Sequence, residues 1–139
     1  MELRLFTPEQ ASTLIPYLEA KVKRLRAAKR DLDAARRQLE VLGLIADSGA
    51  SEGSPDVRSR AAAQDRAQAL ARETEAEVEG IQARGCLVKD LDEGLVDFYS
   101  LRGDRLVFLC WRSGEQDVTF WHSLDGGFTA RRPLEQPES

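Results

Sequence analysis

The residues most able to do chemistry crowd into one segment, LCWRSGEQDVTFWH at residues 109–122. This segment contains Cys110, Glu115 and His122, the last of which is the only histidine of the chain. A thiolate, a carboxylate and an imidazole together suit zinc or another transition metal. Asp97, in the preceding run GLVDF, could supply a fourth ligand from a neighbouring strand. The residue types therefore suggest a metal site.

The spacing of these residues leaves other interpretations open. None of the short spacings typical of metal ligands, such as CxxC, HxxxH or HExxH, occurs in the sequence. In a purely structural interpretation, Cys110 is a small core residue, Glu115 a turn carboxylate, and His122 a partner of Asp97 or of a backbone carbonyl. In an enzymatic interpretation, Cys110 is a nucleophile, or Asp97, Glu115 and His122 exchange protons with a substrate. The sequence does not decide among the three.

Two tryptophans and an arginine in the same region are candidate ligand-binding residues. Trp111 and Trp121 could each stack on a flat ligand, although an indole in a sheet usually packs its ring and uses its N–H for one hydrogen bond. Arg131 could hold an anion or could balance the charge of its own strand. Both roles stay open for each residue.

The connection between the strands of Cys110 and His122 decides whether the two side chains can share a metal. A two-residue turn at Ser113–Gly114 would put them on opposite faces of the sheet. A three-residue loop over 113–115 would instead pair Cys110 with Val118. Cys110 and His122 would then share a face but lie several strand positions apart, roughly 13 Å. We favour the longer loop because it gives the cleaner apolar face. It predicts that the two residues share a metal only with a bulge, a strong sheet twist or ligands from a second subunit.

The elements that must carry these residues begin with a long helix over residues 7–42. Thr7 and Gln10 form a capping box at its start, and Pro16 should kink it or separate its first turns. Its apolar residues form a narrow seam like that of a coiled coil: Leu18, Val22, Leu25, Leu32, Leu39 and Leu42.

A second, alanine-rich helix is expected over residues 56–84, after a loop over 43–55 that is rich in Gly, Ser and Asp. Its apolar side is thin, so it needs a partner, and the leucine seam of the first helix is the obvious one. An antiparallel hairpin would lay the basic stretch 21–30 beside the acidic stretch 73–79. Each exposed ion pair adds only about 0.2–1 kcal/mol, but together such pairs favour this register.

The remainder of the chain is predicted to form a sheet over residues 86–132, followed by a frayed tail at 133–139. Short runs rich in β-branched and aromatic residues alternate there with turn signals, which predicts an antiparallel meander. The expected strands are 95–99, 105–111, 118–122 and 128–132, with edge strands at 87–89 and 3–6. The fold class is therefore α+β, a long antiparallel helical hairpin followed by a small antiparallel β-meander, in a single domain over 1–139.

Composition narrows the class of protein. Charged residues make up 32% and hydrophobic residues 42%, and the net charge is −4, as in a soluble globular protein. No apolar run is long enough to cross a bilayer, and the start of the chain lacks a secretion signal. With only two cysteines, these features predict a cytoplasmic protein. The negative net charge argues against nucleic acid and against an anionic membrane as partners.

Several motifs spread along the chain resemble one bacterial family. FTPEQASTLIP, VKDLDEGLVDF, LCWRSGE, WHSLDGGF and RRPL are similar to the domain-of-unknown-function family numbered 2203. The likeness covers nearly the whole chain, and the ordered combination GLVDF, LCW, GE, WH, GF and R is its specific part. The resemblance implies a small cytoplasmic bacterial protein with a long helical segment and a β-rich C-terminal part, and it implies no particular activity.

A two-helix hairpin has one seam and leaves alanine-rich surface uncovered. We therefore expect a homodimer formed through the helices, or docking of a protein partner there. The expected function is non-catalytic binding or assembly, in which the sheet presents a polar site for a small ligand or for a transition metal such as zinc. The alternative is a metal-dependent or acid–base enzyme that uses Asp97, Cys110, Glu115 and His122.

Overall fold

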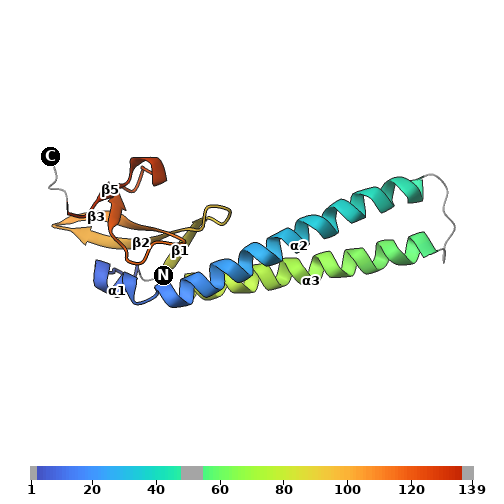
Figure 1. The fold of residues 1–139 in the computed structure, drawn as a ribbon, viewed down its shortest axis with the longest axis horizontal. Helices are drawn as coiled ribbons and strands as arrows, with labels where there is room; N and C mark the ends of the chain where they lie inside the picture. The colour runs from blue at the N-terminus through green and yellow to red at the C-terminus, as the bar shows by residue number, and fades with distance from the viewer. Residues whose placement is uncertain (1–2, 48–54, 136–139) are drawn as a thin grey trace. The chain divides into compact units, whose positions relative to one another are not determined.

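The structure is a computed structural model that describes residues 3–47 and 55–135. It is α+β, with two long packed helices followed by a five-stranded antiparallel sheet (Figure 1). The chain divides into two units. One contains the chain up to Arg24 and from Val78 onward, and the other is Leu25–Glu77. In the part of the chain that the structure describes, no helix is long and apolar enough to cross a membrane.

The first helical segment is split in two, as Pro16 predicts. Helix α1 covers Pro8–Ser12, and helix α2 starts at Ile15 and runs to Asp47. Pro16 thus falls in the first turn of α2, where its missing N–H costs no hydrogen bond. The capping box before α1 is also confirmed, because Thr7 Oγ accepts from the Gln10 backbone and Gln10 Oε1 accepts from the Thr7 backbone.

The leucine seam of α2 is partly confirmed. Helix α3 covers Pro55–Ala83. Among the side chains that the structure describes within Leu25–Glu77, the buried ones are Leu25, Ala28, Leu32 and Ala35 of α2 and Ala63 of α3. Leu39 and Leu42, expected in the seam, are only half-buried.

Helix α2 also continues past the predicted end at residue 42, and the rest of the predicted loop, 48–54, lies outside the described residues. That the basic stretch 21–30 lies beside the acidic stretch 73–79 stays a prediction.

The predicted meander is confirmed, with strand order β1-β2-β3-β4-β5 and antiparallel pairing throughout. The strands are Cys86–Asp90, Leu95–Arg102, Arg105–Arg112, Phe120–His122 and Arg132–Pro133. Two strand predictions are wrong. Residues 128–130 form a 3₁₀ helix, and residues 3–6 form no strand. Phe6 instead makes a single backbone bond to β2, from its N–H to the Tyr99 carbonyl.

The register of β3 and β4 differs from the prediction. Cys110 pairs with Phe120 rather than with Val118, and the chain between the strands is the longer segment 113–119. Val118 is a buried loop residue whose N–H donates to Ser12 Oγ of α1. The carboxylate of Glu19 in α2 accepts from the Ser113 hydroxyl and from the Gly114 N–H. The loop is thus held by α1 and α2, which lie far from the hairpin in the sequence.

This register brings Cys110 and His122 together. His122 lies two positions beyond Phe120, the partner of Cys110, so the two side chains share one face as diagonal neighbours. The expected separation of roughly 13 Å is therefore wrong. The opposite face of the sheet carries Phe98, whose ring contacts Phe6, and also Cys86, which pairs with Phe98. The two cysteines of the chain thus lie on opposite faces.

Candidate metal centre

Three of the four predicted metal ligands converge on one face of the sheet. Asp97 lies in β2, its register partner Cys110 in β3, and His122 at the end of β4. One ligand atom from each residue lies within 4.8 Å of the other two, and all three residues are buried. Ligands of one zinc ion, each about 2.0–2.3 Å from the metal, lie about 3.3–3.8 Å from one another. The ligand atoms thus lie within about 1 Å of the separations that one zinc ion requires.

The hydrogen bonds of His122 determine which of its nitrogens faces the group. Nδ1 lies 2.7 Å from the carbonyl oxygen of Ser123. Because a carbonyl can only accept, Nδ1 carries a proton and donates it. Nε2 lies 2.9 Å from Oδ2 of Asp97, so one proton is shared between these two atoms. A metal that replaced this proton would meet an Nε2 already oriented by the bond of Nδ1, as in most metal-bound histidines.

Burial changes the proton affinity of the other two side chains. Burial raises the pKa of Asp97, against the opposing effects of His122 and Lys89. Burial, together with the charge of Asp97, raises the pKa of the Cys110 thiol to about 12, while Arg131 acts in the opposite direction. Without a metal, Cys110 is therefore a thiol at neutral pH, and a metal must displace its proton.

The same geometry disfavours Cys110 as a catalytic nucleophile. Such a cysteine needs a base that takes its proton, usually a histidine nitrogen. Both nitrogens of His122 are engaged, Nδ1 by Ser123 and Nε2 by Asp97. The high pKa of Cys110 also leaves little thiolate at neutral pH. The residues thus suit metal coordination better than nucleophilic catalysis.

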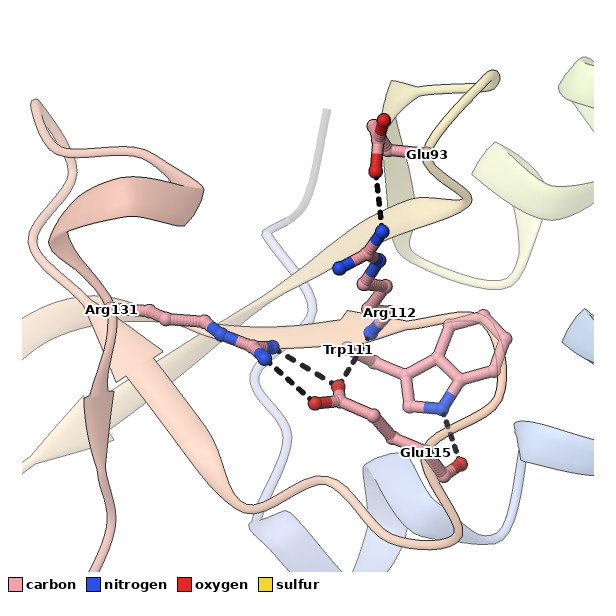
Figure 2. Close-up of polar contacts among 5 residues, drawn as sticks. All are labelled: Glu93, Trp111, Arg112, Glu115 and Arg131. Carbon is pink, nitrogen blue, oxygen red and sulfur yellow. Dashed lines mark hydrogen bonds and ion pairs between the residues drawn. The ribbon is translucent and has the colours of Figure 1, made fainter.

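The structure does not bring Glu115 into the group of ligand atoms. Figure 2 shows its carboxylate facing Arg131, with Nη1–Oε1 and Nη2–Oε2 distances of 3.1 and 2.8 Å. Oε1 also accepts from the backbone N–H of Arg112 at 2.7 Å. Both oxygens of Glu115 are therefore occupied, by Arg131 ahead of β5 and by the backbone at the end of β3.

Arg131 is equally engaged. Its guanidinium lies 3.9 Å from the ring centre of Phe120 and 4.3 Å from that of Phe128, and it donates two hydrogen bonds to Glu115. The side chain is 15% exposed. The anion that Arg131 holds in this structure is thus the carboxylate of Glu115.

Both tryptophans are buried, so neither presents an open ring face to a flat ligand. The Nε1–H of Trp111 donates to the carbonyl of Glu115 at 2.9 Å (Figure 2). Trp121 pairs with Leu109 on the face opposite His122, and the guanidinium of Arg102 lies 4.8 Å from its ring centre. Its Nε1 has no hydrogen-bond partner among the residues that the structure describes. The two rings serve packing.

A cleft of about 90 Å³ opens onto the three clustered residues. Besides these three, its walls include Lys89, Leu95, Phe108, Gly126, Gly127 and Phe128. The sequence singles out none of these as a site residue. The only signal for them is the GG pair in the turn motif DGG, where missing side chains leave room beside the backbone.

Comparison with known proteins gives a family but no activity. The chain matches the model of a family described as Uncharacterized conserved protein (DUF2203) over residues 4–134, a range that includes Asp97, Cys110 and His122. Neither a curated protein nor a solved structure matches the chain. The resemblance seen in the motifs is confirmed, and the chain belongs to the DUF2203 family of uncharacterised conserved proteins.

Proposed function

We propose that this protein binds a divalent transition metal, zinc in the first instance, through Asp97, Cys110 and His122. The observation that carries the proposal is the convergence of their ligand atoms within 4.8 Å in a buried position. Sulfur, nitrogen and oxygen together suit zinc and similar ions, whereas calcium and magnesium prefer oxygen alone. Three protein ligands leave one position of a tetrahedral site open.

Entry of a metal requires a small rearrangement. The 2.9 Å between His122 Nε2 and Asp97 Oδ2 is a hydrogen-bond distance, a few tenths of an ångström shorter than the separation of two ligands on one zinc. The pair must therefore open slightly as the shared proton leaves. His122 lies at the end of the short strand β4, next to a loop, where such a shift is easiest.

The proposal is tested by metal content and by zinc affinity. We expect one zinc ion per chain after dialysis against zinc, measured by elemental mass spectrometry. Cys110→Ser and His122→Gln should each weaken zinc binding by about 100-fold or more, because loss of a direct ligand costs at least as much as loss of a residue that supports one. Competition with a chromophoric chelator measures this affinity.

Cys86 provides a matched control. It is also a free, buried cysteine, but it lies on the opposite face of the sheet. Burial raises the pKa of its thiol to about 11, so its protonation resembles that of Cys110. Cys86→Ser should bind zinc as the wild type does. The proposal fails if the wild type takes up no zinc, or if the Cys86 and Cys110 variants lose affinity equally.

We also propose that the helical hairpin mediates self-association as a homodimer. Val41 and Leu44 are 57% and 70% exposed and lie three residues apart, on one side of α2. Burial of one leucine stabilises an interface by about 1.5–3 kcal/mol, so Leu44→Lys should raise the dimer dissociation constant about tenfold or more. Analytical ultracentrifugation measures this. Leu101→Lys, at an exposed leucine of the sheet, is the control, and a monomeric wild type would refute the proposal.

A further inference from the structure

We infer that the cleft beside Asp97, Cys110 and His122 binds a small organic carboxylate, which takes the open position on the metal. This inference rests on the metal site proposed above and adds the class of ligand. It is carried by two features of the cleft, the charge of Lys89 and the apolar side chains of Leu95, Phe108, Leu124 and Phe128 on its walls.

The charges around the cleft favour an anion. A divalent metal is balanced by the carboxylate of Asp97 and the thiolate of Cys110. The guanidinium of Arg131 is balanced by Glu115, with which it forms two hydrogen bonds. Lys89 then gives the cleft an excess of positive charge, and its Nζ lies 4.6 Å from the ring centre of Phe108, itself a cleft wall. A ligand with one negative charge would complete the balance.

The size and walls of the cleft favour a short carboxylate over an inorganic anion. A cavity of about 150 Å³ holds benzene, so the cleft of about 90 Å³ suits about four non-hydrogen atoms, the size of acetate. Leu95, Phe108 and Phe128 offer no hydrogen bonds to the oxygens of a phosphate, and a polar group buried without a partner is costly. A carboxylate directs its oxygens to the metal and to Lys89 and its apolar end to these walls.

Cobalt(II) is the probe that separates metal binding from carboxylate binding. Absorption from thiolate-to-cobalt charge transfer reports the metal on Cys110, and the visible bands of cobalt report a change of its other ligands. With cobalt-loaded protein, acetate and propionate should change the visible bands in a saturable way, and phosphate should bind more weakly. Lys89→Met should weaken acetate binding by about tenfold with the thiolate band still present.

Lys23→Met is the matched control, because Lys23 is an exposed lysine on α2 and its loss changes the net charge by the same amount. It should leave acetate binding unchanged. Absence of the thiolate band in the wild type would overturn the metal site itself. With the band present, any of three results would overturn the carboxylate inference alone. These are no response to acetate or propionate, phosphate binding as tight as acetate, or equal acetate binding by Lys89→Met and the wild type.

Discussion

Zinc affinity should rise steeply with pH, by about 100-fold for each pH unit, wherever the metal-free site holds both of its protons. One proton belongs to the Cys110 thiol, whose pKa of about 12 keeps it protonated throughout the neutral range. The other is shared between His122 Nε2 and Asp97 Oδ2. Zinc must displace both, and because a rise in pH lowers the concentration of the competing protons, affinity increases with pH.

Calorimetry in buffers of different ionisation enthalpy counts the protons that zinc releases, and chelator competition from about pH 6 to about pH 8 gives the slope. We expect about two protons per zinc wherever the metal-free site holds both. Cys86→Ser should release the same number, because its thiol lies on the other face of the sheet. Zinc binding that is independent of pH would show that Cys110 and the shared proton are not displaced.

The sequence shows which residues could be ligands of this site, but it does not show that their side chains lie close together. Asp97, Cys110 and His122 are visible as potential ligands in GLVDF and LCWRSGEQDVTFWH. Whether they meet depends on the register of β3 and β4, which is set by the segment 113–119. Glu19 in α2 holds that segment through contacts more than ninety residues apart in the chain. No local pattern contains such a contact.

The helices show where local signals suffice and where they do not. The capping box of Thr7 and Gln10 involves neighbouring residues only, and the structure forms it as predicted. The end of α2 depends on more than its local signal. Gly43 lies inside α2. A glycine within a helix costs only about 1 kcal/mol, which is too little to end the helix by itself.

The C-terminal segment shows tertiary contacts overriding strand propensity. Phe128 belongs to a run with the composition of a strand but lies in a 3₁₀ helix. There its ring stacks on Arg131 and forms a wall of the cleft. Strand propensity measures the fit of a side chain to a pleated surface, and these contacts hold Phe128 in a different conformation.

Glu115→Gln should destabilise the metal-free protein by about 2–3 kcal/mol, whereas Glu93→Gln should cost less than about 1 kcal/mol. Both carboxylates bind an arginine of the same region, as Figure 2 shows. They differ in burial, because the side chains of Arg131 and Glu115 are 15% and 23% exposed, against 46% and 54% for Arg112 and Glu93. Loss of one partner leaves a charge unpaired, and the cost grows as water is excluded.

Urea denaturation with zinc chelated isolates this effect from metal binding. In Glu115→Gln, the charge of Arg131 would remain between the rings of Phe120 and Phe128 without its anion, which is the source of the expected loss. If Glu115 were instead a metal ligand, the variant would keep the stability of the metal-free protein and lose zinc affinity. Equal destabilisation by the two variants would contradict the partly buried pair. The comparison therefore decides whether Glu115 supports the loop beside the metal site or belongs to the site itself.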